Sequence, residues 1–204
     1  KVKIEHVATD LSVAFIASVL ENCPGAVHVF DHFHVVKLMN DHLDDIRRKV
    51  YAMEKDVNKR KVLKGTRYLL LGNGEDIFDQ QHKTRLDNAL AMNEPLSKAY
   101  YLKEQLREIW SQISKEKAEA VLDDWVKQAR ESKIPQLMRM AATLLAHRRG
   151  ILAWYDSHVS TGKVEGINNK IKVMKRNAYG FRDDRYFTLR LYALHDCRIT
   201  RNVG

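Results

Sequence analysis

The feature that most limits the fold is a long stretch, residues 35–154, in which no convincing strand pattern occurs. Apolar residues recur there at intervals of three and four, the spacing that places them on one face of an α-helix. Two such stripes are Met39, Leu43, Ile46, Val50 and Met53, and Ala118, Val121, Leu122, Trp125, Val126 and Ala129. Helical patterns also cover residues 88–110, with a break near Pro95, and residues 137–154. We therefore expect a mostly helical chain.

The first 31 residues show a different pattern, two short strands separated by a helix. Residues 2–9 alternate apolar and polar side chains, and residues 26–30 form a short apolar run. Residues 11–23 carry a helical stripe, with Ser12 as its cap and Pro24-Gly25 as its stop. The members of that stripe are Leu11, Phe15, Ile16, Val19 and Leu20. This order predicts a parallel βαβ unit.

Each predicted strand ends at an aspartate, Asp10 and Asp31. Open α/β sheets place functional groups at the carboxyl ends of their strands, so both residues are candidate site residues. Asp31 and His34 have two interpretations. They could hold a metal ion together, or they could be hydrogen-bonded residues that stabilise the strand end.

Residues 163–176 predict a helix with two distinct faces. Val164, Ile167, Ile171 and Met174 form the apolar face, and Glu165, Asn168, Asn169, Lys172 and Arg176 form the other. A carboxylate can hold a divalent cation, and amides and cations can hold phosphate oxygens. The alternative is an ordinary amphipathic helix with a solvated polar face, and spacing alone does not decide between the two.

A glycine-containing loop, residues 177–181, follows this helix, and Tyr186–Cys197 predict a last helix with Phe187, Leu191 and Leu194 inward. Tyr179 and Phe181 lie among the cations Lys175, Arg176, Arg182 and Arg185. These aromatic rings could stack on unpaired or distorted bases, or they could anchor the loop to the core. Both interpretations remain open.

The charge of the chain is unevenly distributed. The net charge is +9, and residues 163–204 hold ten Lys and Arg against four Asp and Glu. A basic end beside a candidate metal-binding acid suggests a polyanion partner, most simply nucleic acid. Lys55–Lys64 is a second cation-rich run, although such runs are usually solvated surfaces.

Several classes of protein are not supported by the sequence. The two cysteines, Cys23 and Cys197, are far apart, and zinc-ligand spacing is absent. No apolar run reaches the length of a membrane span and no signal peptide is evident, which favours a cytoplasmic protein. The sequence opens at Lys1 rather than Met, so we expect a fragment of a longer protein.

The stretch VEGINNKIKVMKRNAYGFRD, preceded by STGK, resembles the C-terminal signature of ISL3-family insertion-sequence transposases. The resemblance continues through VFDHFHVVKLMNDHLDDIRRK, NEPLSKAYYLKEQLREIW and WVKQARESKIPQLMRMAATLLAHRRGILAW, and so covers nearly the whole chain. In that family the glutamate of the EGINNKIK run is the last acid of a catalytic DDE triad. The resemblance therefore implies that Glu165 is a catalytic residue.

The resemblance also implies an α/β fold, a partial RNase H-like (DDE) core with a large all-α insertion before the last catalytic helix. The expected segments are residues 1–35 for the strands of the core, 36–157 for the insertion and 158–204 for the closing catalytic helix and basic end. In RNase H-like enzymes the second catalytic acid follows the fourth strand, a position that Asp10 fits. Asp31 follows the next strand, where related transposases carry an Asp/Cys-x-x-His element, so Asp31 and His34 are expected to be accessory residues.

The function implied is metal-dependent cleavage and strand transfer of DNA. Asp10 and Glu165 are the expected catalytic residues and ligands of Mg²⁺ or Mn²⁺, in a two-metal site that also needs a first aspartate from an earlier strand. We expect the chain without that residue to be inactive. The expected DNA-binding residues are Asn168, Asn169, Lys172, Lys175, Arg176, Tyr179 and Arg182.

The expected partners are transposon ends and target DNA, with the full-length protein a homo-oligomer located in the bacterial cytoplasm near the nucleoid. Two alternatives remain open. One is a remnant of a transposase that binds DNA or other protomers without catalysis, and the other is an RNase H-like nuclease, which would need no long insertion.

Overall fold

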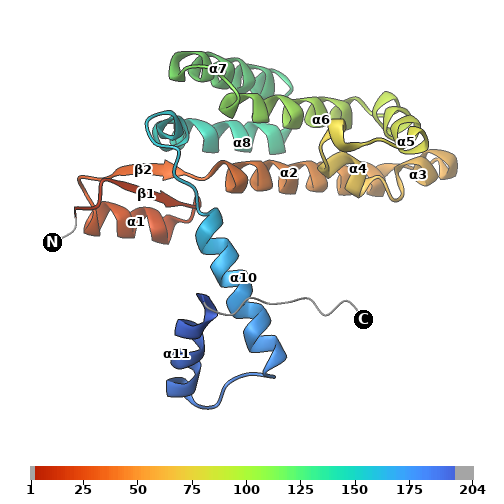
Figure 1. The fold of residues 1–204 in the computed structure, drawn as a ribbon. Helices are drawn as coiled ribbons and strands as arrows, with labels where there is room; N and C mark the ends of the chain where they lie inside the picture. The colour runs from red at the N-terminus through yellow and green to blue at the C-terminus, as the bar shows by residue number, and fades with distance from the viewer. Residues whose placement is uncertain (1–2, 196–204) are drawn as a thin grey trace. The chain divides into compact units, whose positions relative to one another are not determined.

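The chain divides into two units, Lys1–Ser160 and Thr161–Gly204, and the computed structural model describes residues 3–195. The first unit begins with a two-stranded parallel sheet. Strand β1 (His6–Thr9) pairs with β2 (Val27–Phe30) from His6 opposite Val27 to Thr9 opposite Phe30. Helix α1 (Val13–Asn22) connects them (Figure 1). The predicted parallel βαβ unit is confirmed, although the first strand begins later than expected and Val2 lies outside the described residues.

The predicted apolar stripe of α1 is only partly buried. Val19 is buried and Ile16 packs against the core, whereas Phe15 and Leu20 are 55% and 66% exposed. The spacing therefore predicted the helix correctly, but the apolar face that it defines is covered only in part. The physical reason is that the described part of the first unit sets only two short strands against this helix, which cannot cover a stripe that wide.

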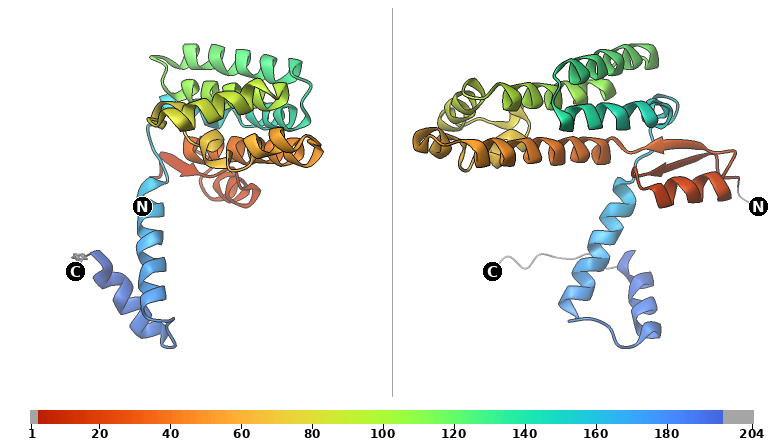
Figure 2. Two further views of the ribbon diagram at one scale, coloured as in Figure 1. Left: turned by 90° about the vertical axis from the view of Figure 1, so that its right-hand side faces the viewer. Right: turned by 180° about the vertical axis from the view of Figure 1, so that it is seen from behind.

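Residues 32–155 are helical, as the absence of a strand pattern predicted. They form α2 (His32–Met53), α3 (Val57–Leu63), α4 (Arg67–Leu71), η1 (Gly74–Asp76), α5 (Gln80–Ala91), α6 (Glu94–Arg107), η2 (Glu108–Trp110), α7 (Lys115–Glu131), α8 (Pro135–Ala146), α9 (Arg148–Leu152) and η3 (Ala153–Tyr155). The long helix α2 runs along α6 and α8, and α7 packs against both of these helices (Figures 1 and 2).

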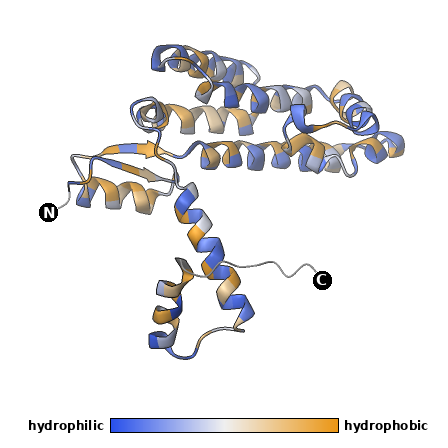
Figure 3. Ribbon diagram, in the orientation of Figure 1, coloured by the Kyte–Doolittle hydropathy of each residue, from blue (hydrophilic) through white to orange (hydrophobic). Residues whose placement is uncertain are grey.

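Local sequence signals explain where these helices stop. The pattern over residues 88–110 is interrupted between α5 and α6, where the Asn93 side chain accepts a hydrogen bond of 3.0 Å from Leu96 N and Pro95 lies in the first turn of α6. The pattern over residues 137–154 is interrupted at His147, between α8 and α9. The helices consequently present apolar faces to one another and polar faces to solvent (Figure 3).

The core of the first unit follows the predicted stripes of α2 and α7. Met39, Leu43 and Trp125 are fully buried, and Trp125 Nε1 donates a hydrogen bond of 2.7 Å to Leu102 O. Met53 is an exception, since it is the last residue of α2 and is largely exposed. Lys103 is also buried, and its Nζ donates to Leu70 O at the end of α4 at 3.0 Å.

The second unit contains α10 (Gly162–Asn177), α11 (Asp184–Tyr192) and η4 (Ala193–His195). Both predicted helices are present, and Cys197, the predicted end of the last one, lies outside the described residues. Of the predicted apolar stripe of α10, Met174 is buried and Ile171 is half-buried, but Val164 and Ile167 are exposed. Within the described residues, the apolar face of α10 is therefore covered only in part.

Candidate catalytic site

Asp10 and Asp31 lie next to each other at the carboxyl edge of the two-stranded sheet. The last paired residues of β1 and β2 are Thr9 and Phe30, so each aspartate is one position beyond its strand. Asp31 N donates to Thr9 O at 3.0 Å, which extends the ladder by one bond. The sheet therefore brings these two predicted site residues together, as expected for neighbouring parallel strands.

The Asp10 carboxylate is half-buried at the turn into α1. Its Oδ1 accepts a hydrogen bond of 2.8 Å from Ser12 N, which is the one hydrogen bond to this carboxylate among the described residues. The backbone oxygen of Asp10 accepts one of 2.7 Å from Thr9 Oγ1, and that hydroxyl lies 2.7 Å from His28 Nε2. Since the Thr9 proton is directed at Asp10 O, His28 Nε2–H is the donor to Thr9. This relay holds the backbone at the end of β1.

Asp31 has a clear structural role. It is 3% exposed and is the N-cap of α2, where its Oδ1 accepts a hydrogen bond of 2.9 Å from Phe33 N. His32 Nδ1 lies 3.6 Å from the same oxygen. His34 follows in the first turn of α2, where its N donates to Asp31 O at 3.1 Å and its ring packs against that of Phe33. Such a cap satisfies backbone donors that a helix otherwise leaves unpaired.

Behind this edge, β2 packs against α9. The Phe30 ring lies between the rings of His28 and His147, at centroid distances of 4.6 and 5.0 Å. Burial, and then the charge of His147, lower the pKa of His28 below its ordinary value, which favours the neutral ring. Gly150 of α9 lies directly on Phe30. These contacts fix the strand that leads to Asp31.

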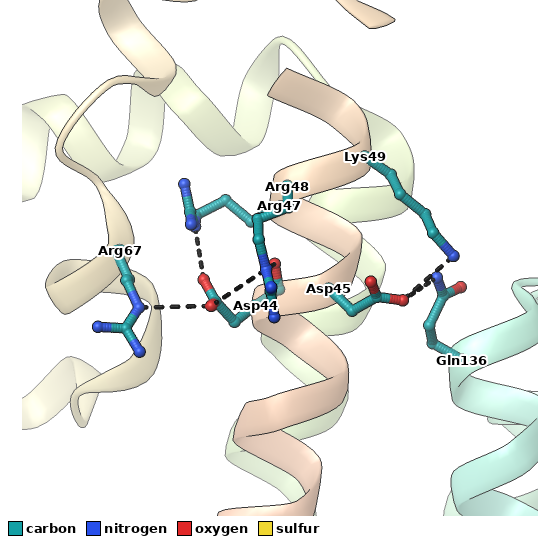
Figure 4. Close-up of polar contacts among 7 residues, drawn as sticks. All are labelled: Asp44, Asp45, Arg47, Arg48, Lys49, Arg67 and Gln136. Carbon is teal, nitrogen blue, oxygen red and sulfur yellow. Dashed lines mark hydrogen bonds and ion pairs between the residues drawn. The ribbon is translucent and has the colours of Figure 1, made fainter. Parts of the chain in front are cut away.

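The acids of the LDD sequence in α2, Asp44 and Asp45, are held by cations and an amide (Figure 4). Asp44 is paired with Arg47 at 2.8 Å and with Arg48 and Arg67 at 3.4 Å. Asp45 Oδ2 accepts a hydrogen bond of 2.7 Å from the buried amide of Gln136 and lies 3.1 Å from Lys49 Nζ. These carboxylates join α2 to α4 and α8, so their role is structural.

In the second unit, Glu165 lies in the first turn of α10, where its backbone N donates to Thr161 O at 2.9 Å. The predicted DNA-binding residues of this helix follow it toward the carboxyl end and are all exposed. They are Asn168, Asn169, Lys172, Lys175 and Arg176. The helix therefore presents one acid near its start and amides and cations beyond it.

Tyr179 and Phe181, the two aromatic residues of the loop after α10, have different environments. Phe181 packs against Phe187 of α11 at a centroid distance of 5.1 Å, and Lys175 Nζ lies 5.3 Å from the Phe187 ring. Tyr179 is instead fully exposed, with φ of 50°, and Gly180 follows with φ of 98°. Two consecutive left-handed residues turn the chain sharply, which projects the Tyr179 side chain into solvent.

Comparisons with known proteins identify the family of this chain. A model of the ISL3-type DDE transposase family, described as "Transposase", matches residues 1–191. The chain belongs to the ISL3 family of transposases. It is 37% identical over 193 residues to the transposase for insertion sequence element IS1001 of Bordetella parapertussis, a match that covers 94% of this chain and 47% of that protein. It is 31% identical over 202 residues to the transposase for IS1557 of Mycobacterium tuberculosis (strain CDC 1551 / Oshkosh), covering 88% and 45%.

The ISL3 chain thus spans about half the length of the curated relatives it matches. No solved structure matches it, so the RNase H-like part of the fold prediction has no structural neighbour for comparison. Within residues 3–195, no group of three or more His, Cys, Asp or Glu side chains is placed to hold a metal ion. In the same residues, no helix is long and apolar enough to cross a membrane.

The structure places the predicted site residues in two sets, Asp10, Asp31 and His34 in the first unit, and Glu165 with the DNA-binding residues in the second. Sequence reasoning missed the Thr9–His28 relay and the packing of Gly150 on Phe30. A strand residue such as Thr9 carries no signal of its partner, because that partner comes from another strand.

Proposed function

We propose that this ISL3 chain provides two acids of a DDE site that cleaves and transfers DNA strands, with Asp10 and Glu165 as the catalytic residues. The observation that carries the proposal is the placement of Asp10 at the carboxyl end of a parallel β-strand, followed by a long helical segment and then by a helix with Glu165 in its first turn. In this proposal residues 1–35 belong to an RNase H-like core, 36–157 are the insertion and 158–204 close the site.

Asp10 is preferred to Asp31 because of how the two carboxylates are engaged. Asp31 is buried and caps α2, so rotating it toward a metal ion would leave Phe33 N without its acceptor. Asp10 is more accessible, and one of its two oxygens accepts a single backbone hydrogen bond. In this proposal Asp31 and His34 support the strand end beside the site.

The donor chemistry fits a magnesium or manganese ion, since carboxylate oxygens are the protein ligands that these hard cations prefer. Asp10 and Glu165 would hold such ions. When bound, two divalent cations supply an activated attacking oxygen and stabilise the leaving oxygen in an in-line displacement at phosphorus. The Thr9–His28 relay fixes the backbone of Asp10, and the hydrogen bond from Ser12 N orients its carboxylate.

The polar face of α10 is proposed to hold the DNA backbone beside the site. Asn168, Asn169, Lys172, Lys175 and Arg176 supply donors for phosphate oxygens, and Arg182 extends the charge. Tyr179 is proposed to stack on an unpaired or distorted base because its ring is exposed while Phe181 anchors the loop.

The proposed substrates are transposon ends and target DNA, which supports an assembly of several copies because two ends must be held at once. The site of action is then the cytoplasm, next to the nucleoid. An RNase H-like nuclease would use the same acids, but the long helical segment of the first unit favours the transposase.

Metal binding tests the acid assignment without requiring activity. Free Mn²⁺ is measured by electron paramagnetic resonance during titration of the 204-residue chain and of the variants Asp10→Asn, Glu165→Gln and Asp31→Asn. Loss of a direct ligand should weaken affinity by about tenfold or more. Matched controls are Asp41→Asn, an exposed acid of α2, and Glu116→Gln, which lies in the first turn of α7 as Glu165 does in α10.

The outcomes separate the alternatives. If Asp10→Asn and Glu165→Gln weaken Mn²⁺ binding and the controls do not, the proposal is supported. If Asp31→Asn weakens binding and Asp10→Asn does not, the second acid is wrongly assigned. If Glu165→Gln behaves like Glu116→Gln, the catalytic interpretation fails and a DNA-binding role without chemistry remains.

A further inference from the structure

We propose that α3 and the two clefts beside it form a second contact surface for the sugar–phosphate backbone of duplex DNA, made of residues other than the proposed catalytic acids and those of α10. This surface, called the α3 surface below, consists of Lys59, Arg60, Lys61 and Lys64 with the facing side of α5. The inference rests on the proposed function only in its choice of DNA as the polyanion.

The larger cleft lies between α3 and α5 and has a volume of about 480 Å³. Its polar lining consists of cations, amides and a hydroxyl, and none of the described residues that line it is an acid. These polar residues are Lys61, Gln80, Gln81, Thr84, Arg85 and Asn88. A surface with this composition offers donors and positive charge, which suits phosphate oxygens.

A smaller cleft lies on the other side of α3, between this helix and the end of α2, and Lys61 lines both clefts. Arg60 and Lys64 also line the smaller one, and the Arg60 guanidinium lies 4.9 Å from the centre of the Tyr51 ring. The aromatic contact restrains Arg60 without neutralising it. Helix α3 is therefore a cationic ridge with a cleft on each side.

The α3 surface carries cations whose charge is not matched by ion pairs with carboxylates of residues 3–195. Within the described residues, none of Lys59, Arg60, Lys61 and Lys64 forms an ion pair with a carboxylate, whereas Arg148 of α9 is paired with both Glu119 and Asp123. The acid at the start of α3, Asp56, is occupied as its N-cap, accepting from Asn58 N at 2.7 Å and Lys59 N at 3.2 Å. The positive charge therefore remains available to a ligand.

One cation of the larger cleft is held in place by the end of α3. Arg85 Nη2 of α5 donates to Lys64 O, a carbonyl that the helix leaves unpaired. Gly65 permits this approach, since it has φ of 77° and a Cβ there would lie 3.0 Å from Arg85 Nη2. A guanidinium fixed before binding loses little side-chain freedom when a phosphate arrives.

The alternative explanation for these cations is structural. Arg60 and Lys61 lie in the last turn of α3, where positive charge stabilises the helix dipole. That explanation predicts effects on stability and none on binding. Duplex DNA carries a dense row of phosphates, and each phosphate contact contributes about 0.9 to the slope of log K against log salt concentration. The change in this slope when one cation of the α3 surface is removed therefore reports the phosphate contact that this cation makes.

The test measures fluorescence anisotropy of a labelled duplex of random sequence with the 204-residue chain over a range of salt concentrations. EDTA is present, so the result does not depend on the carboxylate site. Lys61→Gln should reduce the slope by about 1, and the triple variant Arg60→Gln, Lys61→Gln, Lys64→Gln by about 3. Lys61→Arg should retain the slope of the unmodified chain.

Lys127→Gln is the matched control, because Lys127 is an exposed lysine of a helix, α7, and its loss removes the same net charge. If the slopes of Lys61→Gln and Lys127→Gln are equal, the α3 surface does not contact DNA and the proposal is overturned. The proposal is also overturned if polyglutamate, added at the same concentration of negative charge as the duplex, displaces the duplex from the chain. The α3 surface would then suit an acidic protein. Failure of Mn²⁺ binding leaves this result unchanged, so the two proposals fail independently.

Discussion

Gly150 of α9 has no room for a methyl group, and it lies against the strand that leads to Asp31. A Cβ at this position would lie 2.4 and 2.5 Å from the ring carbons Cδ2 and Cε2 of Phe30, and 3.3 Å from His28 O. The Phe30 ring is confined between the rings of His28 and His147 and is buried. Gly150→Ala must therefore displace either the ring or the helix.

Two effects of opposite sign determine the size of the change. Alanine has a higher helix propensity than glycine, which stabilises the folded state by about 1 kcal/mol. Overpacking a confined site costs about 1–3 kcal/mol. Overlap with two atoms of one confined ring places Gly150→Ala near the upper end, so the net loss should be about 2 kcal/mol. In a chain of this size that corresponds to a fall in Tm of roughly 4–8 °C.

The assay is thermal unfolding followed by circular dichroism, with Gly25→Ala as the control. Gly25 precedes the same strand, and a Cβ there would meet nothing within 4 Å. Gly25→Ala should be neutral or stabilise the chain by up to about 1 kcal/mol through the unfolded state. A Gly150→Ala chain that melts at or above the unmodified chain would refute the claim that a confined Phe30 holds the end of β2.

Two further predictions concern titratable groups. Burial alone would raise the pKa of Asp44, but the hydrogen bond and charge of Arg47, followed by the charges of Arg67 and Arg48, hold that pKa below its ordinary value. The ionised Asp44 carboxylate therefore stabilises the fold above about pH 4, and this contribution is lost as pH falls through the folded pKa. In a denaturant titration at pH 7, Asp44→Asn should lower the free energy of unfolding by about 2–3 kcal/mol, and by much less at acid pH. The control Asp41→Asn should change the free energy of unfolding by no more than about 0.5 kcal/mol. The lowered pKa of His28 likewise favours folding above about pH 6.5, and that contribution is lost as pH falls toward the folded pKa. His28→Gln should therefore flatten the loss of Tm between pH 7 and pH 5, and an unchanged profile would contradict a neutral, half-buried histidine.

Local patterns were sufficient to predict most elements of this ISL3 chain. The stripes of α2 and α7, the βαβ order and the break near Pro95 all depend on residues a few positions apart, which is the range over which periodicity and capping act. Burial was predicted less well. Phe15 and Leu20 of α1 and Val164 of α10 carry the right spacing and are nevertheless exposed. Exposure depends on which element covers a face, and spacing within a helix carries no information about that.

The sequence by itself determined the family, the helical character of the chain, and the positions of Asp10, Asp31 and Glu165 relative to strands and helices. It left open whether Asp31 is a ligand or a cap, and whether Tyr179 and Phe181 serve DNA or the core. In the tertiary structure the buried Asp31 side chain caps α2, Phe181 packs against α11 and Tyr179 is exposed. It also set Arg85 against the end of α3, 21 residues from its partner Lys64. Such contacts form only when separate elements pack together, so their distances and partners arise from the fold and not from any local pattern.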